Sequence, residues 1–184
     1  IGLVFCHQSP RYITIAQAQA IIAALKNTPA QAVAVFRDQN IKTITSILQA
    51  TGLSMAQLHG QECINAHEKL NASITRILSI AADSNGGISL PDEQLNTLDP
   101  ARDYLLIDNL NAGSGETLNL KPISLNKQPL RAFLAGGLKP DNIKNKIREH
   151  QPYAVDVSSG VESSRGIKSQ PLIKTFIQNA RNPS

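Results

Sequence analysis

The sequence contains no tryptophan, and aromatic residues make up only 4% of its 184 residues. Its two cysteines, Cys6 and Cys63, cannot form a disulfide framework, so we expect a reducing compartment and a cytoplasmic location. No apolar run approaches the ~20 residues of a membrane span. The apolar start, Ile1–Phe5, is too short for a signal peptide and has no basic residue before it. These absences argue against a disulfide-rich secreted protein and against a membrane partner.

Positive charge is modest and scattered. The net charge is +4, and the lysines and arginines gather only mildly, between Lys139 and Arg148. A nucleic-acid-binding domain typically concentrates this charge in a stripe with interleaved aromatic residues, so we predict no nucleic-acid partner. The basic balance favours attraction of small anions, with solubility as the alternative explanation. The 41% hydrophobic content indicates a globular chain.

Short β-like runs alternate with helical patterns along the whole chain. Thr14 can cap a first helix, and Ile41, Ile44 and Leu48 have helical spacing. Further helices are predicted near Cys63–Leu70 and over Pro140–Glu149 and Leu172–Ala180, and the polar stretch Ser84–Leu98 is interpreted as a loop with a short helix. The predicted strands are Ile1–Phe5, Gln31–Phe36, Met55–Leu58, Ile74–Ala81, Tyr104–Asp108, Arg131–Ala135 and Tyr153–Val157.

Seven strands, each followed by a helix or loop, predict right-handed βαβ units and a parallel sheet. No linker interrupts the chain, so residues 1–184 are predicted to form one domain. Units of only ~25 residues favour an α/β fold of the (β/α)8 TIM-barrel type. The alternative is an open doubly wound sheet, which usually carries its phosphate turn after the first strand. Seven strands are one short of a closed barrel, so we expect the first strand and helix to lie upstream of Ile1.

Two glycine-bearing turns in the last third of the chain carry the strongest functional signal. Gly136 and Gly137 follow one predicted strand, and Ser158, Ser159 and Gly160 follow the next. Each sequence is interpreted as a strand, a tight turn and a helix start, where main-chain N–H groups bind phosphate. In a TIM barrel such a cradle commonly follows strands seven and eight. We predict a phosphate against the N–H groups of Gly137 and of Ser159 or Gly160; ordinary turn chemistry is the alternative.

Charged residues follow other predicted strands. Asp108 ends one, where a barrel places its chemistry, and its carboxyl group can act as a general acid if burial raises its pKa. The alternative is an aspartate that caps the following loop. Arg11, just after the first strand, can bind a carboxylate with both arms of its guanidinium group, or it is an ordinary surface arginine. Asp156 ends the last strand and is expected to face the mouth of the pocket in a supporting role.

His59, Cys63 and His67 have the i, i+4, i+8 spacing of ligands on one helix face. However, Gly60 indicates a strand-to-helix turn, which would separate His59 from the other two. We therefore predict no metal site and no cofactor. His59 is expected to orient a loop near the pocket, and Gln57 to line the site from the end of its strand.

Several motifs occur together in a characteristic order. They are Pro10–Ile13, Val35–Phe36, Gln57–Gly60, Leu106–Asp108, Gly113–Gly115, Leu134–Leu138 with Asn142, and Asp156–Glu162 with Gly166–Lys168. In this order, the chain resembles the phosphoribosylanthranilate isomerase family of tryptophan biosynthesis, from residue 1 to about residue 181. Val35–Arg37 is similar to the isomerase half of enterobacterial bifunctional enzymes. In those, indole-3-glycerol-phosphate synthase precedes the isomerase, so a fusion is an open alternative.

The resemblance implies an Amadori rearrangement of N-(5′-phosphoribosyl)anthranilate, an aminoaldose phosphate, to an aminoketose. It implies that Asp108 is the general acid, that Arg11 contacts the anthranilate carboxylate, and that no cofactor is needed. It also implies a cysteine base in a Lys-x-Cys-Gly motif on the first strand, which these 184 residues do not contain. Cys6 is either a small apolar filler or a substitute base. We therefore expect the chain alone to be inactive, and unstable or self-associating.

The sequence also departs from the family. Glu116 stands where a basic or neutral residue is usual, and Leu120 replaces an aromatic residue, so loop closure over the substrate is expected to differ. Two other functions stay open. One is a degenerate, non-catalytic barrel that binds a phosphorylated sugar without a general base. The other is a different barrel enzyme with the same cradle, such as a sugar-phosphate epimerase, although the sequence offers no metal ligands for it.

Overall fold

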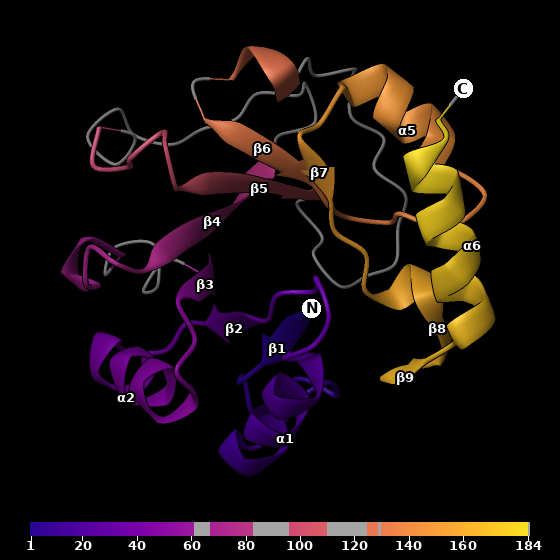
Figure 1. The fold of residues 1–184 in the computed structure, drawn as a ribbon. Helices are drawn as coiled ribbons and strands as arrows, with labels where there is room; N and C mark the ends of the chain where they lie inside the picture. Colours follow the sequence, from indigo (N-terminus) through magenta and orange to yellow (C-terminus); the bar gives the residue numbers. More distant parts are fainter. Residues whose placement is uncertain (61–66, 83–95, 110–124, 129, 184) are drawn as a thin grey trace. The chain divides into compact units, whose positions relative to one another are not determined.

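The computed structural model describes residues 1–184 except 61–66, 83–95, 110–124, 129 and 184. The chain divides into two compact units, Ile1–Ser79 and Ile80–Ser184, which are taken in turn. In the described part of the chain, strands β1 to β7 form a seven-stranded sheet in sequence order (Figure 1), and each strand pairing given by the structure within it is parallel. This order confirms the predicted succession of βαβ units.

The first unit alternates strands and helices. Thr14 caps its first helix in a capping box: the N–H of Gln17 donates to Thr14 Oγ1 (3.2 Å), and the N–H of Thr14 donates to Gln17 Oε1 (2.8 Å). The second helix begins after the Asn40 cap and ends at Gly52, whose φ of 70° suits a left-handed terminus. The elements are β1 (Gly2–Val4), α1 (Ile15–Leu25), β2 (Val33–Arg37), α2 (Ile41–Thr51), β3 (Met55–His59), η1 (His67–Lys69) and β4 (Thr75–Ala82), which runs on into the second unit.

One face of the first-unit strands makes its core. In β2 and β3, Phe36 pairs with Leu58, and both side chains are fully buried. Ile44 and Leu48, one turn apart on α2, are also buried, as an amphipathic helix against a sheet requires. Because side chains alternate along a strand, Gln57 and His59 share the opposite face of β3.

The second unit carries the two glycine turns. Its elements are β5 (Tyr104–Asn109), η2 (Leu125–Lys127), β6 (Arg131–Leu134), α5 (Ile143–His150), β7 (Ala154–Val155), η3 (Ser159–Val161), β8 (Glu162–Ser164), β9 (Ile167–Lys168) and α6 (Gln170–Arg181). In Figure 1, β5, β6 and β7 lie side by side, and α5 packs beside α6. The Asn179 amide on α6 donates to the Pro140 carbonyl before α5 (2.7 Å) and ties the two helices together.

All seven predicted strands are present, with ends that differ by a few residues. The expected helix start directly after Ser158–Gly160 is wrong: the turn runs into the three-residue helix η3 and an antiparallel hairpin, β8–β9. Gly166, with a φ of 85°, permits the hairpin turn. Helix α6 begins only at Gln170, where Ser169 caps it and Pro171 occupies its first turn.

Other predicted segments fall wholly or partly outside the described residues. These are the helix near Cys63–Leu70, of which the structure describes only the 3-10 turn His67–Lys69, most of the stretch Ser84–Leu98, and the glycine loop with Glu116 and Leu120. The assignment of residues 1–184 to one domain stays a prediction.

Candidate active site

Two aspartates lie in one row at the carboxyl ends of the second-unit strands. Ile107 on β5 pairs with Leu134 on β6, and Leu134 pairs with Val155 on β7. The next residues along the three strands are therefore level with one another, which places Asp108 and Asp156 in the same row, two strands apart. Two strand spacings amount to about 10 Å. Parallel strands bring their carboxyl ends to one edge, where this fold class carries its chemistry.

Asp156 is the carboxyl group that its surroundings perturb. Burial raises the pKa of Asp156, the negative charge of Asp108 raises it further, and the positive charge of Lys168 opposes the shift. A raised pKa means that the folded protein holds the proton of Asp156 more tightly than the unfolded chain. Ionisation of Asp156 therefore costs folding stability as the pH rises from about 3.8, its unperturbed value, through the higher pKa of the folded state.

Asp156→Asn is expected to raise the melting temperature at pH 8 by about 2–5 °C, because asparagine cannot ionise in the buried position. The difference in melting temperature between Asp156→Asn and the unmodified protein should shrink as the pH falls towards 4, because Asp156 itself becomes protonated. Thermal unfolding followed between pH 4 and pH 8 measures this. Asp141→Asn, at an exposed position, is the matched control. A lower melting temperature at pH 8 for Asp156→Asn would contradict the raised pKa.

The two glycine turns pack directly against each other. A side-chain carbon built on Gly160 would lie 1.8 Å from the carbonyl oxygen of Leu138, so only glycine permits this approach. Gly136 and Gly137 both have positive φ, 83° and 64°. In the described part of the chain, the N–H groups of Gly137, Ser159 and Gly160 donate to no protein acceptor. N–H groups without a protein acceptor, on two turns packed against each other, are suited to binding an anion.

Two polar side chains that the sequence interpretation left without a role hold these turns. Asn142 accepts from the N–H of Lys139 (2.8 Å) and donates to the carbonyl of Gly137 (2.9 Å). Lys168 on β9 donates to the carbonyl of Ser158 (2.8 Å) and pairs with Glu162 on β8 (2.9 Å). Asn142 belongs to the motif that includes Leu134–Leu138, and Lys168 belongs to the motif Gly166–Lys168. Both motifs accompany the glycine turns in the sequence, and this proximity could have identified the two residues.

Arg11 lies in the first unit, in the segment between β1 and α1. Its N–H donates to Ser9 Oγ (3.1 Å), and its side chain is half-buried. The segment is held at both ends, since the N–H of Ser9 donates to the carbonyl of Cys6 and the N–H of Ile13 to that of Val4, each at 3.0 Å. Arg11 thus stands on an ordered segment that follows the carboxyl end of its strand.

Gln57 and His59 are brought together on β3. Gln57 Nε2 lies 2.6 Å from His59 Nε2. Burial, and then the positive charge of Arg37, lower the pKa of His59 to about 4, against the opposing charge of Asp38. His59 is therefore uncharged at neutral pH and serves as a hydrogen-bonding partner rather than a cation. His59 is the last residue of β3, and Gly60, with a φ of 81°, follows it.

The described residues contain no group of three or more histidine, cysteine, aspartate or glutamate side chains that can hold a metal ion. Cys6, which follows β1, is a half-buried free thiol. None of the helices described is long and apolar enough to cross a membrane.

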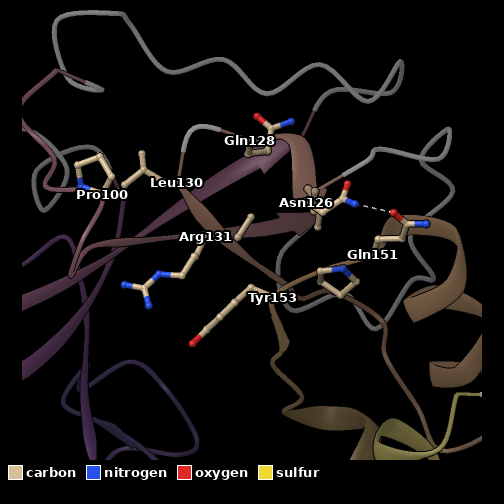
Figure 2. A pocket seen from close by; sticks show the side chains of 10 residues that line it. Pro100, Asn126, Gln128, Leu130, Arg131, Gln151 and Tyr153 are labelled. Carbon is tan, nitrogen blue, oxygen red and sulfur yellow. Dashed lines mark hydrogen bonds between the residues drawn. The ribbon is translucent and has the colours of Figure 1, made fainter.

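A hollow of about 350 Å³ lies elsewhere in the second unit (Figure 2). It opens at the amino ends of β6 and β7, near Gln128, where Asn126 and Gln151 share a hydrogen bond of 2.7 Å. Beside it, the Arg131 guanidinium group lies 4.3 Å from the ring centre of Tyr104 and 5.3 Å from that of Tyr153. None of the candidate site residues lines this hollow, and in this fold class the amino ends of strands serve stability.

Comparisons with known proteins place the chain in a family. Residues 1–179 match the family model described as N-(5′-phosphoribosyl)anthranilate (PRA) isomerase. An N-(5′-phosphoribosyl)anthranilate isomerase of Marinomonas is 35% identical, and the match covers 98% of this chain and 86% of that protein.

Among solved structures, the phosphoribosyl anthranilate isomerase of Thermotoga maritima has a TM-score of 0.79 at 31% identity, covering 98% of this chain and 86% of that one. A phosphoribosyl anthranilate isomerase in complex with reduced 1-(o-carboxyphenylamino)-1-deoxyribulose 5-phosphate has a TM-score of 0.74 at 30% identity, with the same coverage. The similar structures have the (β/α)8 TIM-barrel fold. This chain belongs to the N-(5′-phosphoribosyl)anthranilate isomerase family.

Proposed function

We propose that the chain isomerises N-(5′-phosphoribosyl)anthranilate to 1-(2-carboxyphenylamino)-1-deoxyribulose 5-phosphate in tryptophan biosynthesis, with Asp108 as the general acid. The reaction needs a proton at the furanose ring oxygen, so that the ring opens as the anthranilate nitrogen supplies electrons. It then needs a base for the proton on C2′. No residue of this chain is assigned to the base, and no cofactor enters the reaction.

The single observation that carries the proposal is the row of carboxyl groups beside the cradle. Asp108 stands at a strand end in the same unit as the packed turns of Gly137 and Gly160. A phosphorylated sugar held by its phosphate in the cradle presents its reacting carbons to the same strand edge, since both features lie at the carboxyl ends of β5 to β7. Asp156, whose pKa is raised, supports the pocket and takes no proton from the substrate in this proposal.

Anthranilate carries a carboxylate, which requires a cation of its own. Arg11 offers a planar guanidinium group on an ordered segment after β1, and it suits two-point binding of a carboxylate. Neutral His59 and Gln57 are proposed to line the substrate's side of the pocket as hydrogen-bonding groups. A cytoplasmic location and a fusion to indole-3-glycerol-phosphate synthase stay predictions.

Turnover of N-(5′-phosphoribosyl)anthranilate, followed by the loss of its fluorescence, tests the proposal. Arg11→Ala is expected to raise KM by about tenfold or more with a much smaller change in kcat, because it removes a charge-assisted contact that ground state and transition state share. Arg181→Ala, at the exposed end of α6, is the control and should keep the original KM. No turnover by a protein that joins this chain to an upstream strand and helix with the Lys-x-Cys-Gly motif would contradict the function. An unchanged KM for Arg11→Ala in that protein would remove Arg11 from the site.

A further inference from the structure

Lys168 lies beside the second glycine turn, which it contacts through the Ser158 carbonyl, and it takes no part in the proposed proton transfer. Its ammonium group donates to the carbonyl oxygen of Ser158 at 2.8 Å and lies 3.5 Å from Ser158 Oγ. Its third contact is the carboxylate of Glu162, at 2.9 Å. The Lys168 side chain is 42% exposed, whereas that of Glu162 is 4% exposed. Because the Lys168 ammonium group is partly exposed to water, its ion pair with Glu162 adds little to folding stability. The contact of Lys168 with the Ser158 carbonyl has a different consequence.

That consequence follows from the geometry of one peptide group. The carbonyl of Ser158 and the N–H of Ser159 belong to the same planar peptide, and the described residues contain no cis peptide bond. In a trans peptide the C=O and N–H point in opposite directions. Because Lys168 holds the Ser158 oxygen, it also turns the Ser159 N–H away from itself. The same contact draws the negative end of the peptide dipole away from an anion bound by that N–H.

The position of Lys168 is itself set by the hairpin. Glu162 on β8 lies opposite Lys168 on β9 in the strand register, which puts the two side chains next to each other. The other carboxylate oxygen of Glu162 accepts from the N–H of Gly166 in the hairpin turn, at 3.1 Å. The N–H of Ser169 donates to the carbonyl of Val161 at 2.9 Å and closes the base of the hairpin. The hairpin thus aims one ammonium group at one carbonyl.

We propose that Lys168, held by Glu162, is a positioning residue that fixes the Ser158–Ser159 peptide with its N–H directed at the phosphate group of the substrate. The inference rests on the proposed phosphate cradle. It assigns to the β8–β9 hairpin the function of aligning the cradle, which a plain connection between β7 and α6 would not need. Lys168 acts through the backbone and not on the reacting atoms.

Lys168→Met is expected to raise KM for N-(5′-phosphoribosyl)anthranilate and the competitive inhibition constant of inorganic phosphate by about tenfold each, with kcat changed less than about threefold. Lys168→Arg should recover part of the affinity, because arginine also donates to a carbonyl. Methionine removes the Lys168 ammonium group from the Glu162 carboxylate, so the double variant Glu162→Gln with Lys168→Met is included to protect folding. Lys174→Met, on the exposed side of α6, is the control.

The outcomes separate the two proposals. If inorganic phosphate does not compete with substrate in the unmodified enzyme, the cradle is wrong and the inference falls with it. If phosphate competes, but the double variant keeps the original KM and phosphate inhibition constant, the cradle stands and the role of Lys168 is overturned. A fall in kcat and melting temperature with unchanged phosphate inhibition would show a merely structural role and would also overturn it.

Discussion

In the complete enzyme, with its upstream strand and helix, replacing Asp108 by asparagine is expected to lower kcat by about 10²- to 10⁴-fold while KM changes little. The loss is that of a general acid, since the amide keeps the shape of the side chain but has no acidic proton for the ring oxygen. The substrate is held elsewhere in the proposal, by the cradle and by Arg11, so binding should survive. Steady-state rates at several substrate concentrations separate the two parameters.

Two comparisons make the Asp108 result interpretable. Asp141→Asn, at an exposed position before α5, should keep the original kcat. This control shows that the loss of a carboxylate does not by itself lower kcat. The melting temperature of Asp108→Asn shows whether the protein still folds. A drop in kcat smaller than about threefold, in a protein that melts normally, would exclude Asp108 as the acid and direct attention to Asp156 in the same row.

Gly160→Ala is expected to raise KM by tenfold or more and to weaken inhibition by inorganic phosphate by a similar factor. The added carbon would lie 1.8 Å from the carbonyl oxygen of Leu138, a separation at which backbone must move. The two turns would be pushed apart, and the N–H groups of Gly137 and Ser159 would no longer converge on one anion. Overpacking of this kind also costs about 1–3 kcal/mol of folding stability.

Gly52→Ala is the matched control for that loss of stability. Gly52 ends α2 with a φ of 70°, and a carbon built on it meets nothing within 4 Å. Alanine there is destabilising through backbone strain alone, by about 1–2 kcal/mol. Both variants should therefore melt at lower temperatures, but only Gly160→Ala should change KM. Equal effects on KM would mean that general destabilisation, rather than the cradle, accounts for the result.

The two glycine turns differ in how well the structure after them could be predicted from the local sequence. Leu134–Leu138 was correctly interpreted as a strand followed by a glycine turn, because both are local features. After Ser158–Gly160 the same reasoning predicted a helix and missed the β8–β9 hairpin. Two- and three-residue strands have too few residues for alternation to show. Their pairing depends on a glycine turn and on one ion pair across the strands.

The sequence by itself determined the alternation of seven strands with helices, the helix cap at Thr14 and the order of the family's motifs, because each depends on residues close together in the chain. Only the tertiary structure decided which groups meet. Strand register put Asp108 and Asp156 in one row, and burial together with the charge of Asp108 raised the pKa of Asp156. Close approach of Gly160 to Leu138 joined two turns about 20 residues apart, as the neighbouring strands of a parallel barrel allow. These effects act through space, so no local pattern in the chain records them.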